Sequence, residues 1–353
     1  MKSILFAAFS IALVIMSACS ANKQQSRETE QLNTAVRQII LSNSEDTLNG
    51  SILIAKGPDI LVRQNYGFID VAKTAPITDQ SRFNIGSACK EIPGMAILEL
   101  IRLGKMSYDD KLDRYLKDLP TWAGKISIRD LLFYKSGLPP FNFVTSGNDE
   151  FALANLRYIE NLPFEPGTHY LYDNWNNFLQ AKIVESVVQQ GFQSWVKDHF
   201  FQPLEMQSAV YTGNPPSISE NMTWAYSKAH GDDVRYNPRY KQFALCYAPL
   251  YMTALDLYKW ISYVQQQYEE GGEAIPEFFQ PTSLEGQGPL GVTEWEDGQV
   301  KLHRHGGAAY SFGNRIYRDY HSRLTIIIMS NADQWAEMER IEQELLNWWA
   351  DNN

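Results

Sequence analysis

The sequence predicts a mixed α+β fold in which one sheet is built from both ends of the chain. Near the start, residues 51–55 and 60–66 have strand composition and flank a Gly57-Pro58 turn, which is typical of an antiparallel hairpin. Near the end, three further runs have strand character: 300–304, 312–318 and 324–329. The residues between them, about 90–275, have mostly helical patterns, so we expect an inserted helical lobe.

Helical periodicity supports the rest of this organisation. Apolar residues recur at helical spacing over 28–41, and Met338, Ile341, Leu345 and Trp348 fall on one face of a last helix. Within the middle of the chain, four further helices are predicted: 95–103, 128–133, 176–188 and 255–267. A cleft between two lobes is a common place for a ligand site.

Composition excludes several classes of protein. The chain has 353 residues, of which 44% are hydrophobic and 20% are charged, as in an ordinary globular protein. Acidic residues number 41 and basic residues 31, which gives a formal net charge of −10. Because an acidic surface repels phosphate backbones, we expect no nucleic-acid partner.

The N-terminus has the features of an export signal. Lys2 precedes an apolar stretch, Ile4 to Met16, that is shorter than the about 20 residues needed to span a bilayer. We therefore predict a signal peptide over 1–18. Cys19 follows small residues and resembles the lipid attachment site of bacterial lipoproteins; the alternative is ordinary cleavage near Ala18 or Ala21.

These features predict an exported lipoprotein, anchored by its lipid on the periplasmic side of a bacterial membrane, with the outer membrane favoured. A polar tether over 19–27 then leads into a folded domain at 28–350. Within that domain we place the sheet lobe at about 28–86 and 285–350 and the helical lobe at about 90–275.

Cysteine and histidine spacing gives no sign of a metal. His303 and His305 form a bare H-x-H without an acidic residue at the spacing that metallohydrolases use, so we expect no metal. Cys89 and Cys246 do not define a disulfide framework. They are interpreted as small buried hydrophobic residues, with a bridge between them as the alternative.

Ser87 and Lys90 are the first candidates for chemistry. Three residues apart on a helix, they lie on one face. A serine hydroxyl is a weak nucleophile until a base takes its proton, and a lysine can do so when its pKa is lowered toward neutrality. A surface serine and lysine at this spacing by chance is the alternative.

Two later strings carry further candidate groups. Tyr172 and Asn174 follow a Pro-Gly turn; a phenol beside an ammonium can shuttle protons, and an amide can bind a substrate carbonyl. His305-Gly306-Gly307 leads into strand-like residues, and its glycines allow a backbone to approach a substrate closely. Taken singly, each string also fits a tyrosine in the core or a histidine in a loop.

Taken together and in order, these strings resemble the serine β-lactamase and penicillin-recognising family, in its class C-like branch. The resemblance covers about residues 51–331 and is carried by these segments: Phe83-Asn-Ile-Gly-Ser-Ala-Cys-Lys90, Leu103-Gly-Lys-Met-Ser-Tyr-Asp-Asp-Lys111, Ile128-Arg-Asp-Leu-Leu132, Ser136-Gly-Leu-Pro139, Pro166-Gly167, Tyr172-Asp-Asn174, Pro203-Leu-Glu-Met206, Thr253-Ala-Leu-Asp256, His305-Gly-Gly307 and Ile326-Ile-Ile-Met-Ser-Asn331. A sister branch uses S-x-x-K with S-D-N and K-T-G. The resemblance implies a β-lactamase/transpeptidase-like fold, with an antiparallel sheet flanked by helices.

The resemblance also implies roles. Ser87 would form an acyl-enzyme while Lys90 and Tyr172 share the proton transfers, with no cofactor. The backbone N–H groups of Ser87 and Ala308, the latter following Gly307, would form the oxyanion hole. Asn174 would bind the acyl side of the substrate, and His305 would orient the leaving group or a carboxylate.

The implied function is an exported serine hydrolase that acts on an amide or ester as an esterase or peptidase. Its substrate would be a small molecule or peptide, with cell-wall material among the candidates. Two alternatives stay open: a true class C-like β-lactamase or D-Ala-D-Ala carboxypeptidase, and an inactive relative that binds the cell wall.

Some positions depart from the family pattern. Pro93 and Gly94 fall within the helix expected to carry Ser87, where proline removes a hydrogen bond. Asp173 separates Tyr172 from Asn174, and an inward carboxylate would oppose Lys90 as a base. Ala248-Pro249 and Lys135 also replace residues that relatives often carry, which leaves the substrate preference open.

Overall fold

The computed structural model describes residues 27–43, 46–140, 149–212, 221–227, 232–233 and 250–352, with the backbone alone at 232–233. The predicted signal peptide, Cys19, Cys246 and Ala248-Pro249 lie outside the described residues. Within these ranges, no helix combines the length and the apolar character needed to cross a bilayer.

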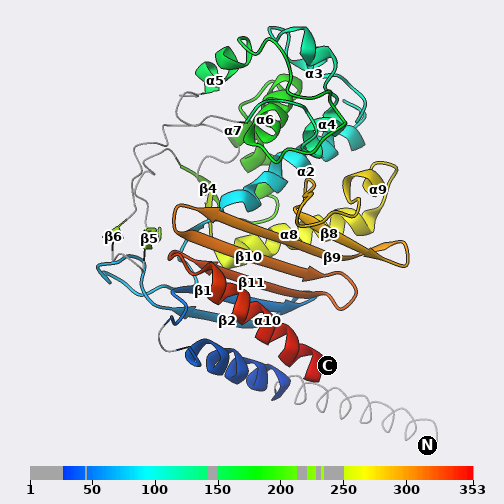
Figure 1. Cartoon of the computed structure of the whole chain (residues 1–353). Helices are drawn as coiled ribbons and strands as arrows, with labels where there is room; N and C mark the ends of the chain where they lie inside the picture. Colours follow the sequence, from blue (N-terminus) through cyan, green and yellow to red (C-terminus); the bar gives the residue numbers. More distant parts are fainter. Residues whose placement is uncertain are drawn as a thin grey trace, which may run out of the picture.

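A six-stranded antiparallel sheet forms the centre of the molecule (Figure 1). Its strands are ordered β2-β1-β11-β10-β9-β8, so strands from the start of the chain lie next to strands from its end. The bounds are β1 Gly50–Lys56, β2 Asp59–Tyr66, β8 Val292–Glu296, β9 Gln299–Ala309, β10 Phe312–Asp319 and β11 Leu324–Ser330. The prediction of one sheet built from both ends is therefore correct.

Strands β1 and β11 are buried on both faces because helices cover both faces of the sheet. In β1 and β11, Ile52 and Ile328 belong to the core under the terminal helices, whereas Leu53 and Ile327 belong to the core on the opposite face. The terminal helices are 27–41 and α10, Trp335–Asn352. Helix α8, Ala254–Glu270, packs against β1 and β11 from the other side. Alternating side chains thus face two cores, which explains the nearly continuous apolar runs of these strands.

The remaining helices gather at one end of the molecule, with α2 running between them and the sheet (Figure 1). They are α2 Glu91–Arg102, α3 Leu112–Tyr115, α4 Ile128–Leu132, α5 Asp149–Leu156, α6 Asn174–Val188 and α7 Phe192–Val196, with α9 at Ile275–Phe278 nearer the sheet. Short turns η1 Gly86–Lys90, η2 Thr121–Gly124 and η3 Lys197–Phe201 adjoin them. Helix α6 packs against α2 and α4.

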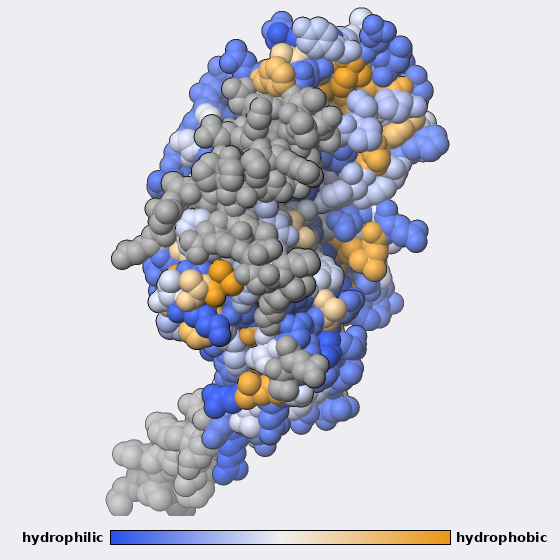
Figure 2. Space-filling view, turned by 60° about the vertical axis from the view of Figure 1, so that its left-hand side comes forward, coloured by the Kyte–Doolittle hydropathy of each residue, from blue (hydrophilic) through white to orange (hydrophobic). Residues whose placement is uncertain are grey.

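Two small sheets complete the described fold. One has the order β3-β7-β4 and the other pairs β5 with β6. Their bounds are β3 Phe83–Asn84, β4 Val210–Tyr211, β5 Tyr226–Ser227, β6 Asp232–Asp233 and β7 Leu250–Met252. On the face drawn in Figure 2, hydrophilic residues dominate, and hydrophobic residues show only in small groups among them.

Candidate active site

Ser87 lies in η1, a turn of 3₁₀-helix that continues directly into α2. The chain enters this turn through backbone and side-chain hydrogen bonds: Ile85 N donates to Leu250 O at 3.0 Å, and Gly86 N donates to the Asn84 side chain at 2.9 Å. Gly86 has a φ of +51°, which glycine adopts readily. Small sheet β3-β7-β4 therefore fixes where the Ser87 helix begins.

Lys90 lies one 3₁₀ turn beyond Ser87. Side chains three residues apart eclipse each other in a 3₁₀-helix. The Lys90 Nζ donates to Ser87 Oγ at 3.0 Å, and the lysine is only 4% exposed. The structure thus brings the predicted nucleophile, which is partly exposed, into direct contact with a buried amine.

Tyr172 lies beside Lys90, although it comes from another part of the chain. Its ring centroid lies 5.0 Å from Lys90 Nζ, so the ring face receives the amine. The ring packs against Tyr134 at 4.7 Å between centroids, and Leu171 N donates to Tyr134 O at 2.8 Å. Tyr134 therefore holds Tyr172 beside the lysine by both its backbone and its ring.

Asn174 is the first residue of α6, and Asp173 is its N-cap. The Asp173 carboxylate accepts the Trp175 N–H at 2.8 Å. A carboxylate at a helix N-terminus satisfies a backbone donor and interacts favourably with the helix dipole. Asp173 thus serves to start the helix that carries Asn174, which gives this departure from the family pattern a structural explanation.

Replacing Asp173 by alanine is expected to destabilise the protein by about 1 kcal/mol, because the cap of α6 is lost. Asp173→Asn keeps an oxygen for the Trp175 N–H and should retain most of that stability. Chemical denaturation measures both effects. A large change in the reactivity of Ser87 in the asparagine variant, without a change in stability, would contradict the capping role and point to a carboxylate that acts on Lys90.

Gly307 and Ala308 lie against the start of the Ser87 helix. A Cβ added at Gly307 would be 2.0 Å from Ile85 O, and one added at Gly86 would be 2.7 Å from Ala308 N. Asn314, which the sequence interpretation missed, bridges the two segments: its Nδ2 donates to Ile85 O at 2.6 Å and to Gly307 O at 3.0 Å. Glycine is therefore required where β9 meets the serine turn.

His305 is buried in a network that the sequence did not predict. Its Nδ1 lies 2.7 Å from Glu91 Oε1, and His303 Nε2 lies 2.8 Å from the same oxygen. Trp260 Nε1 donates to Glu91 Oε2 at 2.9 Å. Burial by itself would raise the pKa of Glu91, but the hydrogen bonds from the two imidazoles outweigh it and hold that pKa below its ordinary value.

The H-x-H pair nevertheless has an acidic neighbour in the fold, although none stands at the sequence spacing that metallohydrolases use. Glu91 supplies the carboxylate from a distant part of the chain, and sequence spacing cannot reveal it. The ligand atoms of Glu91, His303 and His305 all lie within 4.8 Å of one another, so these are residues that could hold a metal ion.

Pro93 and Gly94 are accommodated without a break in the helix. Pro93 is the third residue of α2, in the first turn, where a missing N–H costs least. A Cβ added at Gly94 would be 3.1 Å from Pro289 Cβ and 3.4 Å from the Phe278 ring. Glycine there allows α2 to pack closely against the segment before β8.

Cys89, in η1, has a free thiol and is buried in the hydrophobic core. Burial raises the pKa of this thiol to about 12. It is therefore a small apolar core residue, as one of the two sequence interpretations has it.

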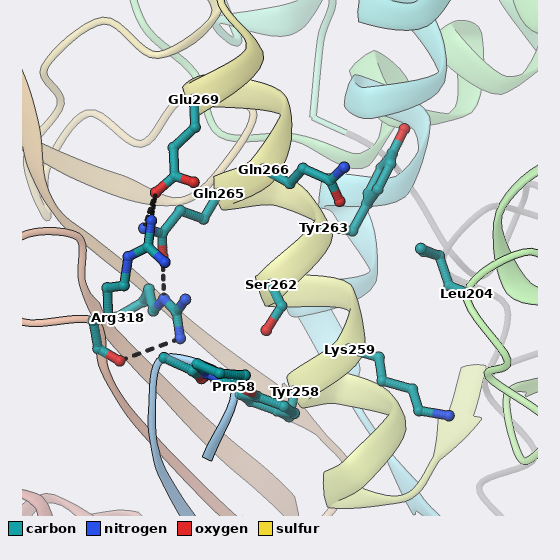
Figure 3. Close-up of a pocket in the computed structure, with 12 residues that line it drawn as sticks. Pro58, Leu204, Tyr258, Lys259, Ser262, Tyr263, Gln265, Gln266, Glu269 and Arg318 are labelled. Carbon is teal, nitrogen blue, oxygen red and sulfur yellow. Dashed lines mark hydrogen bonds and ion pairs between the residues drawn. The ribbon is translucent and has the colours of Figure 1, made fainter. Parts of the chain in front are cut away.

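Figure 3 shows a pocket of about 500 Å³ that is separate from this site. It lies between α8, the β1–β2 turn and the β10–β11 turn, and Tyr258, Lys259 and Arg318 are among its residues. None of its lining residues is a predicted site residue. Ser87 and Lys90 lie instead where η1 meets β9.

A serine and a buried lysine at the start of a helix beside an antiparallel sheet are the arrangement of the β-lactamase/transpeptidase fold, and solved structures agree. A penicillin-binding protein from Bacillus halodurans aligns with a TM-score of 0.73 at 22% identity, over 87% of this chain and 98% of that one. A class C β-lactamase aligns at 0.73 and 16% identity, over 91% and 97%. D-alanine carboxypeptidase AmpC from Burkholderia cenocepacia gives 0.70 and 18%, over 90% and 99%.

The sequence pattern of the family described as Beta-lactamase matches residues 32–346, and the chain belongs to this family. Penicillin-binding protein 4* of Bacillus subtilis is 30% identical over 173 residues, 46% of this chain and 38% of that protein. Protein flp of Staphylococcus aureus strain MRSA252 is 24% identical over 222 residues, 60% and 44% of the two chains. The matched part thus spans less than half the length of these relatives.

Proposed function

We propose that this protein is a serine hydrolase that forms an acyl-enzyme on Ser87. The observation that carries this proposal is the 3.0 Å contact between Lys90 Nζ and Ser87 Oγ, made by a lysine that is 4% exposed. A chance pair of surface residues would not hold a long amine inside the protein against a hydroxyl. Burying an amine is costly, so such a contact is typical of a functional pair.

The proposed reaction has two halves. Ser87 Oγ attacks the carbonyl carbon of an amide or ester, and its proton passes to Lys90 as a neutral amine or to the Tyr172 phenolate. The leaving group departs with that proton when the carbonyl reforms. A water molecule then attacks the ester that joins the acyl group to Ser87. The same groups move a proton from this water to Ser87 Oγ, and the acid product leaves.

The developing negative charge would be stabilised by the Ser87 and Ala308 backbone N–H groups. The close approach of Gly86 to Ala308 supports this role, because it holds the two backbone segments together. Losing one such donor typically costs about 3 kcal/mol of barrier. Asn174 would bind the acyl side of the substrate from the first turn of α6.

An amide or ester of a small molecule or peptide is the proposed substrate. The solved structures with this fold include a penicillin-binding protein, a class C β-lactamase and a D-stereospecific amidohydrolase from Streptomyces. Their names refer to penicillin binding, to a β-lactamase and to an amidohydrolase, which supports a substrate with an amide bond. The leader sequence and Cys19 further support export and lipid anchoring, with cell-wall fragments as natural candidates for the substrate.

The test is covalent labelling with a fluorophosphonate and with a fluorescent penicillin, followed by peptide mass spectrometry. We expect a stoichiometric adduct on the peptide that contains Ser87. Parallel assays with nitrocefin, p-nitrophenyl esters and D-amino-acid amides then separate β-lactamase, esterase and peptidase activities. A folded protein that neither probe labels and that hydrolyses no substrate would overturn the proposal in favour of a binding protein.

A further inference from the structure

Glu91 is a buried carboxylate in contact with three side chains from two other elements. It is the first residue of α2 and is fully buried, as is His303, whereas His305 keeps 4% of its surface exposed. His303 and His305 come from β9, and Trp260 comes from α8. The carboxylate therefore links α2, which follows directly on the Ser87 turn, to β9, the strand that carries Gly307.

The hydrogen bonds determine which ring nitrogens carry protons. Glu91 Oε1 can only accept, so His303 donates through Nε2 and His305 donates through Nδ1. The other nitrogen of His303, Nδ1, is buried and has no partner among the described residues, which fits an unprotonated nitrogen better than an orphaned N–H. Because His305 donates through Nδ1, its Nε2 is the nitrogen that can accept a hydrogen bond from a ligand.

A bound metal fits this network less well than hydrogen bonds do. One carboxylate oxygen lies 2.7 and 2.8 Å from the two imidazole nitrogens, which are ordinary hydrogen-bond distances. A histidine that binds a metal also usually donates through its second ring nitrogen, and no acceptor for His303 Nδ1 lies in the part of the chain that the structure describes.

We propose that Glu91 is a positioning residue that fixes His305 as its Nδ1–H tautomer and presents Nε2 toward the reaction site. Gly307 and Ala308, two and three residues beyond His305, lie against the Ser87 turn, so the histidine orientation and the proposed oxyanion hole share one strand. Trp260 occupies the second carboxylate oxygen and keeps the group from rotating. The catalytic consequence rests on the proposed hydrolase function; the tautomer does not.

Glu91→Gln tests the proposal because an amide cannot accept hydrogen bonds on both sides. Its NH₂ group must face either the indole N–H or the imidazoles, which disrupts the network. We expect the rate of Ser87 labelling to fall by about 10²-fold. Trp260→Phe is the matched control: it removes one hydrogen bond to Glu91 but leaves both histidine contacts, and we expect a loss of less than about 10-fold.

A second measurement separates positioning from general damage. The ¹⁵N chemical shifts of histidine report which ring nitrogen is protonated, and a His305→Gln variant assigns the signals. We expect the Nδ1–H form of His305 in the parent protein and a change in the His305 ¹⁵N shifts in Glu91→Gln, whichever way the new amide faces.

Unchanged His305 shifts in that variant, or a labelling rate equal to that of the parent, would overturn the proposal. So would stoichiometric zinc in the purified protein whose removal by a chelator moves these signals. If no probe labels the parent protein, the hydrolase proposal fails, and the ¹⁵N experiment still decides the role of Glu91.

Discussion

Replacing Lys90 by methionine is expected to slow the labelling of Ser87 by about 10³-fold. Methionine has a similar length and is apolar, so it can fill the space of a side chain that is 4% exposed. It removes the amine that contacts Ser87 Oγ at 3.0 Å and so removes one of the two proposed proton acceptors. The second-order rate constant for fluorophosphonate labelling measures the effect, with Ser87→Ala as the unlabelled reference.

Lys182→Met is a suitable control for the loss of a lysine. Lys182 is also largely buried, but its Nζ pairs with Asp149 at 2.6 Å and with Glu185 at 2.8 Å. We expect that variant to lose stability and to keep its labelling rate. A Lys90→Met protein that is labelled as fast as the parent would show that Lys90 is not the base, and Tyr172→Phe would then be the decisive variant.

The sheet and most long helices could be predicted because their signals are local. The continuous apolar run of β1 and the 3.6-residue repeat in α10 are properties of single segments. Strand β8 was missed because its local signal is weak. Its run Val292–Glu296 is short and half exposed, and it becomes a strand by pairing with β9 at the sheet edge.

The contact of Ser87 with Lys90 was also within reach of the sequence, since a three-residue spacing places both on one side of a helical turn. Its exact form was not, because the 3₁₀ geometry of η1 depends on Asn84 and on the approach of Ala308. The proline in α2, which looked disruptive, falls in a first turn that becomes recognisable only when the helix start at Glu91 is known.

Contacts between distant residues could not be predicted. Glu91 meets His303 and His305 across 212 and 214 positions of the chain, and Asn314 reaches Ile85 across 229. Such pairs follow from how β9 and β10 lie against the serine turn, and no spacing rule within one segment reports them. The reactive groups could therefore be predicted from the sequence, whereas the residues that position them were identified only in the folded structure.

Replacing Gly307 by alanine is expected to abolish detectable labelling and to destabilise the protein by about 3 kcal/mol. The added Cβ would lie 2.0 Å from Ile85 O and 2.5 Å from Asn314 Nδ2, and it would approach Ala88 N at 3.0 Å. Two of these three atoms belong to the backbone of the Ser87 turn, so the clash cannot be relieved by rotating a side chain. Strand β9 must then move away, and the Ala308 N–H moves with it.

Gly191→Ala is the matched control, because a Cβ at Gly191 would meet nothing within 4 Å. Its backbone, with φ −59° and ψ 136°, is also accessible to alanine. We expect that variant to stay within about 0.5 kcal/mol of the parent in unfolding free energy and to be labelled at the same rate. A Gly307→Ala protein that matches the parent in both measurements would show that β9 does not press against the serine turn, and the proposed oxyanion hole would lose its structural basis.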